Sequence, residues 1–89
     1  MGELDQVIVW RVGSRIRVRV EYFDPLGRLR REDLYPPWSD LEAALDWSAD
    51  LLRRRGLKGS GRVRQLQGSR LVPLPELQAR FLRRLQGAS

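Results

Sequence analysis

Apolar and charged residues alternate almost without interruption in the segment from residue 14 to residue 23. Ile16, Val18, Val20 and Tyr22 occupy every second position, and arginines take most of the positions between them. Successive side chains of an extended chain point to opposite faces. The alternation therefore predicts a β-strand with one buried face and one charged face.

Two turn sequences bound this strand and predict an antiparallel three-stranded meander over residues 6–35. The β-rich segment 7–12 leads into a Gly-Ser pair at 13–14 that is typical of a two-residue hairpin turn. The Asp-Pro-Leu-Gly sequence at 24–27 is typical of a type I turn with glycine in the left-handed position. Two prolines at 36–37 end the third strand, because proline cannot donate to a ladder.

A capping-box sequence marks the start of a helix predicted over about residues 40–55. Ser39 is placed to cap the first turn, and Glu42 is placed to reach back to it. Leucines and alanines follow at helical spacing and form one apolar side. Gly56 is a suitable residue to end the helix.

A side of the same helix is acidic. Glu42, Asp46 and Asp50 repeat every four residues, and such a stripe is most simply a solvated face. We expect Asp50 to pair with Arg53 or Arg54 of its own helix.

The second half of the chain predicts a loop, a short hairpin over residues 62–72 and a last helix from about Pro75. The predicted order is β-β-β-α-β-β-α. This order indicates one small two-layer α+β domain over residues 1–89, with frayed ends at 1–5 and 87–89. Its antiparallel sheet, formed by the meander and the short hairpin, carries both helices on one face.

Composition favours a binding module over an enzyme. The chain has 17 Lys and Arg, 11 Asp and Glu, a net charge of +6, and neither histidine nor cysteine. Histidine and cysteine supply most general bases, soft nucleophiles and transition-metal ligands, so we expect no catalysis, no cofactor and no metal. No apolar run approaches the roughly 20 residues of a membrane span, and we expect a cytoplasmic protein. Abundant arginine also suits a GC-rich or thermophilic genome, so arginine content alone does not establish a function.

The predicted register places aromatic side chains among arginines on the charged face of the meander. A two-residue turn at 13–14 sets Trp10 opposite Arg17, and the next turn sets Tyr35 opposite Arg17 as well. Bases stack on such aromatic rings while phosphates meet guanidinium groups. We therefore expect a small non-enzymatic module that binds DNA or RNA. The expected nucleic-acid contacts are Trp10, Arg15, Arg17, Arg19, Tyr35, Lys58, Arg62 and Arg64.

The same register supports a second interpretation. It places Asp33 opposite Arg19, and such cross-strand pairs are ordinary stabilisers of a sheet. Trp10 packed on Arg17 would then be a cation–π contact that seals the surface. The arginines would serve the chain's own ion pairs and the acidic surface of a protein partner, or a second copy would cover the apolar part of the face as a homodimer. The sequence leaves both a nucleic-acid module and a protein-interaction or regulatory domain open.

The glycine-rich segment 56–61 predicts a flexible loop. Its first four residues, at 56–59, have the Gly-x-x-Gly spacing that KH domains use to clamp a nucleic-acid backbone. In KH domains that loop joins two helices, whereas here a strand is predicted to follow. We therefore interpret the glycines as a helix C-cap loop.

Overall fold

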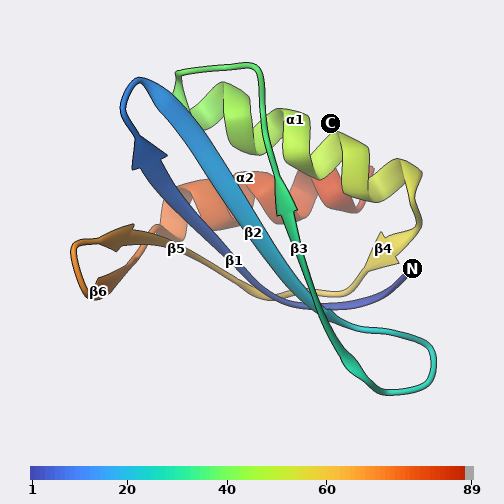
Figure 1. The fold of residues 1–89 in the computed structure, drawn as a ribbon. Helices are drawn as coiled ribbons and strands as arrows, with labels where there is room; N and C mark the ends of the chain where they lie inside the picture. Colours follow the sequence, from blue (N-terminus) through green and yellow to red (C-terminus); the bar gives the residue numbers. More distant parts are fainter. Residues whose placement is uncertain (88–89) are drawn as a thin grey trace.

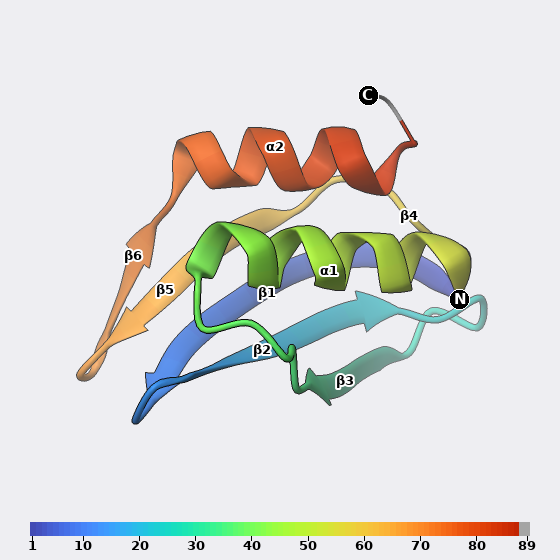
Figure 2. The same ribbon diagram turned by 90° about the horizontal axis from the view of Figure 1, so that it is seen from above.

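The computed structural model describes residues 1–87 and has two layers, a six-stranded sheet and two helices that cover one of its faces (Figure 1, Figure 2). The strands are β1 (Gly2–Val12), β2 (Arg15–Phe23), β3 (Leu29–Leu34), β4 (Leu57–Lys58), β5 (Arg62–Gln67) and β6 (Arg70–Pro73). The helices are α1 (Leu41–Arg54) and α2 (Pro75–Leu85). The α+β class and the predicted order of the main elements are confirmed. Neither helix in this part of the chain is long and apolar enough to cross a membrane.

The sheet is mixed rather than purely antiparallel, which corrects the prediction from the sequence. Its order is β3-β2-β1-β5-β6, with β4 also paired to β1. β1 runs antiparallel to β2 but parallel to both β4 and β5. β1 and β2 are antiparallel, and so are β2 and β3, so β3 runs parallel to β1. The connection through α1 then starts the following strands in the same direction as β3. A strand that follows α1 and lies beside β1 must therefore run parallel to it.

The chain between residues 2 and 5, predicted as part of a frayed end, forms the start of β1. Gly2 pairs with Leu57 of β4, and Leu4 is buried in the core. The same pairing turns part of the predicted glycine-rich loop into a short strand. The predicted frayed end at 87–89 lies mostly outside the described residues.

The predicted register of the first hairpin is confirmed. Val12 pairs with Arg15 and Trp10 pairs with Arg17. Gly13 has a φ of +62°, a left-handed conformation that glycine adopts without steric cost. This register directs the apolar residues of β2 toward the helices and its arginines away from them.

The hydrophobic core lies between the helices and the sheet face that they cover. Its buried apolar residues are Leu4, Val7, Val9, Ile16, Val18, Val20, Leu34, Ala44, Leu45, Ala49, Leu52, Leu57, Val63, Phe81 and Leu85. β1 and β2 contribute the valines and Ile16 of their inward positions, as the alternation predicted. Leucines and Phe81 of the two helices fill the other side, so the core uses one face of the sheet.

Helix α1 is capped by Asp40 and not by Ser39, the predicted cap. Asp40 has an extended backbone, with φ −84° and ψ 129°, and its Oδ2 accepts the backbone N–H of Ala43 at 2.9 Å. Ser39 instead presents its carbonyl oxygen to the guanidinium of Arg11 at 3.2 Å. Serine and aspartate are both favoured caps, so the pattern does not distinguish these neighbours. The carboxylate has the further advantage of a favourable interaction with the helix N-terminus.

The acidic side of α1 contacts arginines of α2, which corrects the prediction of a solvated acidic face. Arg80 donates to the two carboxylate oxygens of Asp46 at 2.8 and 3.0 Å, and Arg84 donates to Asp50 at 2.9 and 3.1 Å. Glu42 lies 2.8 Å from Arg80. Asp50 thus pairs with the other helix rather than with an arginine of its own. These two bidentate arginine–carboxylate pairs hold the two helices in register.

Candidate nucleic-acid interface

The sheet face opposite the helices, which we call the outer face, holds seven of the eight predicted contact residues. They are Trp10 on β1, Arg15, Arg17 and Arg19 on β2, Tyr35 directly after β3, and Arg62 and Arg64 on β5. Both helices lie on the other side of the sheet (Figure 2). Within residues 1–87, no second layer covers the outer face.

Trp10 stands in the middle of a row of side chains that crosses the outer face. On one side it is paired with Arg17, whose guanidinium carbon lies 4.9 Å from the centre of the Tyr35 ring. On the other side it shares a hollow with Leu66 and Leu71, which are cross-strand partners in the β5–β6 hairpin. The row therefore passes from exposed leucines through an indole to a guanidinium group and a phenol.

Arg19 connects Trp10 to Asp33. Its guanidinium carbon lies 5.4 Å from the centre of the Trp10 ring, and its Nε and Nη2 atoms donate to the Asp33 carboxylate at 2.8 and 3.2 Å. The sequence placed Arg17 on Trp10, but the cation–π partner of Trp10 is Arg19. Long side chains reach diagonal neighbours on the next strand as well as the residue directly opposite. The backbone register therefore does not determine which of the two arginines contacts Trp10.

A chain of polar contacts crosses four strands next to this row. Arg64 on β5 donates to the amide oxygen of Gln6 on β1, and the Gln6 amide nitrogen donates to Glu21 on β2. Arg31 on β3 donates to the same carboxylate at 3.1 Å. Glu21 is only 7% exposed, and a buried charge is tolerated when it is paired and hydrogen-bonded. These contacts supply the Glu21 carboxylate with hydrogen-bond donors from within the sheet.

Hydrogen bonds lower the pKa of two carboxyl groups on the outer face, those of Glu21 and Asp33. The Gln6 amide is the main cause for Glu21, and the Arg19 guanidinium is the main cause for Asp33. On the helical side, an arginine of α2 likewise lowers the pKa of Asp46. Burial opposes each shift without cancelling it. The carboxylates of Glu21 and Asp33 are thus charged at neutral pH and already engaged by the chain's own side chains.

We expect the free energy of unfolding to be level between about pH 5 and 7 and to fall in acid. The folded chain holds the pKa of Glu21, Asp33 and Asp46 below the ordinary range. The unfolded chain therefore binds protons first as the pH drops below about 4, and stability is lost from there downward. No histidine or cysteine titrates near neutrality.

Urea unfolding at pH 3, 5 and 7 measures this pH dependence. The Asp33→Asn variant should lose less stability between pH 5 and 3 than the wild type, because one shifted carboxyl group is removed. Equal stability at pH 3 and pH 7 would contradict the expectation.

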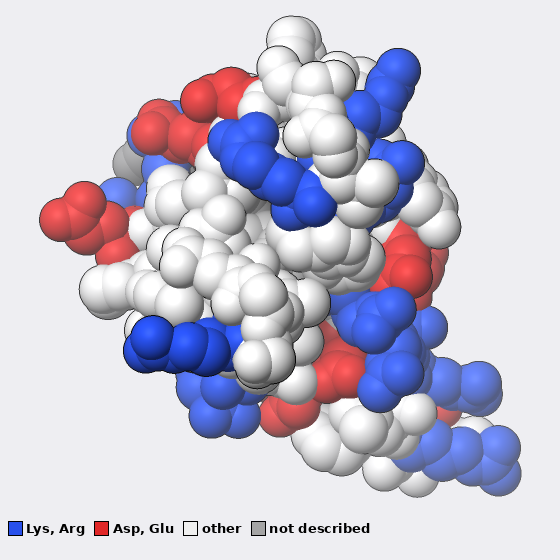
Figure 3. Space-filling view, turned by 60° about the vertical axis from the view of Figure 1, so that its left-hand side comes forward, with Lys and Arg blue, Asp and Glu red and all other residues white. Residues whose placement is uncertain are grey.

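Four arginines of the outer face form no ion pair within residues 1–87. They are Arg15, Arg17, Arg62 and Arg64. Arg17 is stacked on a neutral ring and Arg64 is bonded to a neutral amide, so neither charge is neutralised. Seen from the side of the two hairpins, blue side chains stand around a broad uncharged area, with red carboxylates in smaller groups beside them (Figure 3). On the outer face, Ile8, Trp10, Leu66 and Leu71 are uncharged and lie between the arginines of β2 and β5, so the unpaired arginines stand around an apolar centre.

An open hollow of about 320 Å³ occupies part of that centre. It is lined by Ile8, Trp10, Arg19, Leu66, Ser69 and Leu71. Leu66 and Leu71 are 36% and 39% exposed. A concave apolar lining with a few polar groups is typical of ligand sites.

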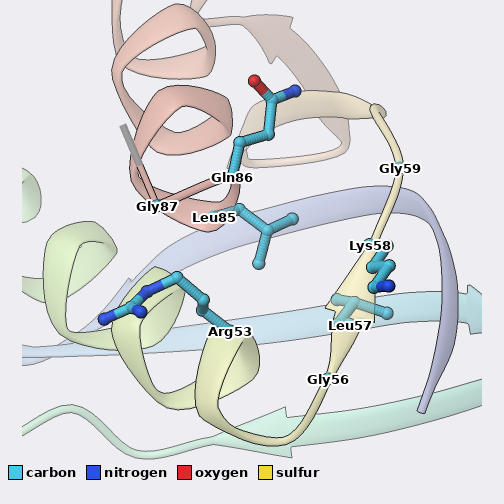
Figure 4. Close-up of a pocket in the computed structure, with 8 residues that line it drawn as sticks. All are labelled: Arg53, Gly56, Leu57, Lys58, Gly59, Leu85, Gln86 and Gly87. Carbon is cyan, nitrogen blue, oxygen red and sulfur yellow. The ribbon is translucent and has the colours of Figure 1, made fainter. Parts of the chain in front are cut away.

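Lys58, the eighth predicted contact, lies apart from the other seven. It belongs to β4, opposite Glu3 of β1, and lines a pocket of about 450 Å³ between β4 and the C-terminal ends of the helices (Figure 4). The neighbouring Leu57 is buried. The Gly-x-x-Gly segment 56–59 therefore contributes a short strand to the sheet, and its backbone is not a free clamp for phosphate.

The outer face offers groups that bind anions and flat rings. Guanidinium groups grip phosphates and carboxylates, and the faces of indole and phenol rings attract cations and stack on other rings. Glu21 and Asp33 accept hydrogen bonds from the chain itself, so neither is free to move a proton. In residues 1–87, no three side chains of His, Cys, Asp or Glu are grouped so that they could hold a metal ion.

Sequence reasoning missed the part of the hollow that the β5–β6 hairpin contributes. Alternation along β5 places Leu66 on the same face as Arg62 and Arg64, and Leu71 faces Leu66 across the turn. That signal was present in the sequence. The position of this hairpin next to β1, which brings the leucines to Trp10, depends on the parallel pairing of β1 with β5.

Searches of family models, curated proteins and solved structures find no match for this chain. Fold alone would not decide a function, since unrelated activities share the same small folds. A function must be inferred from the outer face itself.

Proposed function

We propose that the chain is a small non-enzymatic module that binds nucleic acid on its outer face. The observation that carries this proposal is the position of the four arginines without ion pairs. Two of them lie on β2 and two on β5, on either side of the strand that holds Trp10. A polyanion that carries flat rings matches both kinds of group, because phosphates meet guanidinium groups and bases meet aromatic and apolar side chains.

The spacing of the strands suits a nucleic-acid strand that lies along β1. Neighbouring strands of a sheet are about 4.8 Å apart, so β2 and β5 flank β1 at a separation of about 10 Å. Ile8 and Trp10 alternate along β1 between these two strands, opposite Arg19 and Arg17. A chain of phosphates above β1 would have unpaired guanidinium groups within reach on both sides.

Charge favours a polyanion over a second copy of the chain. In a two-fold dimer built on the outer face, the same patch meets itself. Unpaired arginines would then lie against unpaired arginines, while Glu21 and Asp33 are already engaged within their own chain. Like charges placed across an interface cost several kcal/mol.

A protein-interaction domain, homodimeric or not, is the second candidate. The observation that favours it is the exposure of the cross-strand partners Phe23 and Leu29 on the outer face, at 42% and 55%. Contiguous exposed apolar surface commonly marks a protein contact. Light scattering at micromolar concentration distinguishes a monomer from a homodimer, since the monomer has a mass of 10.4 kDa. A stable dimer would favour the second candidate.

We expect oligonucleotide binding to weaken steeply as salt rises. Four guanidinium–phosphate contacts give a slope near +3 in log Kd against log salt for a single strand, or about 50-fold weaker binding at 200 mM than at 50 mM salt. Removing one contact in Arg17→Ala should reduce the slope by roughly one unit. Fluorescence anisotropy with labelled DNA and RNA oligomers measures both effects.

Arg83→Ala is the matched control for this experiment. Arg83 is exposed on α2, on the helical side of the sheet, so its removal should leave the slope unchanged. The same loss in both variants would point to nonspecific attraction by net charge. Absence of binding to any DNA or RNA oligomer at 50 mM salt would refute the proposed function.

A further inference from the structure

We infer that the hollow beside Trp10 receives one unpaired base, which makes the module selective for single-stranded nucleic acid. The inference rests on the proposed function and adds a specific subsite to it. The subsite joins Trp10 of β1 to the leucines of the β5–β6 hairpin, so strands far apart in the sequence build it together.

The walls of the hollow are chemically suited to a flat ring. Ile8, Leu66 and Leu71 supply apolar surface, and Trp10 supplies an aromatic ring at the same opening. The two leucines are more than a third exposed, so the apolar wall that they form is open to solvent. A planar base can cover such surface on one side and stack on an aromatic ring on the other.

Trp10 is held in place before any ligand arrives. Arg19 lies over its ring at 5.4 Å and is itself fixed by two hydrogen bonds to Asp33. An anchor that is already ordered loses little conformational entropy on binding. Arg19 therefore acts as a positioning residue for the indole, and its charge is already balanced by Asp33.

Two unpaired guanidinium groups flank the hollow. Arg17 is the cross-strand partner of Trp10 on β2, and Arg64 is the partner of Ile8 on β5. A base seated beside Trp10 would bring the phosphates before and after it toward these two groups. The occupant thus has to combine a flat ring with negative charge on both sides, which is the repeating chemistry of a nucleic-acid strand.

This geometry excludes a base that remains in a duplex. Paired and stacked bases expose only their edges, and a base enters a pocket only after it is unstacked and unpaired, at an energetic penalty. A single strand carries no pairing penalty. A free mononucleotide offers the same ring and one phosphate group, but it lacks the second flanking phosphate.

The test compares fluorescein-labelled (dT)12 with a 12-mer of the same charge in which every position is abasic, at 50 mM salt. We expect the abasic strand to bind on the order of 10- to 100-fold more weakly. Trp10→Ala should weaken the binding of (dT)12 by a similar factor and abolish the difference between the two strands. A 12-bp duplex should bind more weakly than (dT)12, and thymidine monophosphate should compete poorly.

Two further variants guard against loss of the fold in Trp10→Ala. Leu71→Ala removes an exposed wall of the hollow from the edge strand β6 and should reduce the preference for the intact strand. Leu29→Ala is the matched control, because Leu29 is an exposed leucine at the other end of the outer face, opposite Phe23. It should leave the preference unchanged.

The outcomes separate the inference from the proposed function. Equal binding of intact and abasic strands by the wild type, or tighter binding of the duplex, would overturn the base subsite and leave nucleic-acid binding standing. If thymidine monophosphate competed as effectively as unlabelled (dT)12, the ligand of the hollow would be a mononucleotide, and the inference of a single-stranded ligand would be wrong. No binding of any of these probes would overturn both.

Discussion

Replacement of Phe81 by alanine should lower the free energy of unfolding by about 3–5 kcal/mol. Phe81 is 1% exposed and belongs to the core cluster between α2 and the sheet. Its removal forfeits the transfer free energy of a phenyl group and leaves a cavity that the surrounding strands and helices cannot fully close. A domain of this length has a total stability of about 4–13 kcal/mol, so the variant should be close to unfolding.

Phe23→Ala provides the matched control. Phe23 is 42% exposed at the end of β2 on the outer face, so the same change should cost less than about 1 kcal/mol. Urea unfolding of both variants at pH 7 measures the difference. If the two variants lost equal stability, the core would not be where the structure places it.

Gly61→Val should destabilise the protein by about 3 kcal/mol. A Cβ atom at Gly61 would lie 2.5 Å from the carbonyl oxygen and 2.9 Å from the carbonyl carbon of Asp5. Asp5 stands at the bulge of β1, between Leu4 and Gln6, directly before the residues of β1 that pair with β5. The obstructing atoms belong to the backbone and cannot rotate away, so the strands would have to separate. The reduced freedom of the unfolded chain, worth about 0.4–1 kcal/mol, is too small to offset this.

Ser60→Ala tests whether the effect is specific to the close approach. Ser60 is the preceding residue and is exposed, so its change should stay within about 0.5 kcal/mol. Amide hydrogen exchange in Gly61→Val should accelerate first in β1 and β5, since their pairing is the contact that is forced apart. Unchanged exchange in these strands would show that the close approach does not matter. The same displacement would also move Arg62 and Arg64 on β5, so oligonucleotide binding should weaken with it.

The meander could be predicted from the sequence because its determinants are local. The period of two in residues 14–23 and the glycine turn at 13–14 establish both the strand and its register. The pairing of Trp10 with Arg17 and of Arg19 with Asp33 followed directly. Which arginine lies over which ring did not follow, because side-chain rotamers choose between direct and diagonal neighbours.

The ion pairs between the helices could not be predicted from the sequence, for a different reason. The spacing of Asp46 and Asp50 and of Arg80 and Arg84 is visible in the sequence. Nothing local says that the two stripes face each other. That follows only from α1 and α2 lying side by side on one face of the sheet (Figure 2).

By itself, the sequence determined the order of the main elements, the register of the meander and the presence of arginines and Trp10 on its uncovered face. The position of the β5–β6 hairpin was decided only by the tertiary structure. After α1, β5 could pair with a free edge at β3 or at β1. β3 is a charged edge strand, whereas Val7 and Val9 of β1 are apolar and are fully buried in the structure, where β5 lies beside them. With β2 on one edge of β1 and β5 on the other, Leu66 lies next to Trp10 and arginines lie on both sides of it. No local pattern connects β1 with β5, because hydrophobic burial acts between segments that are distant in the sequence.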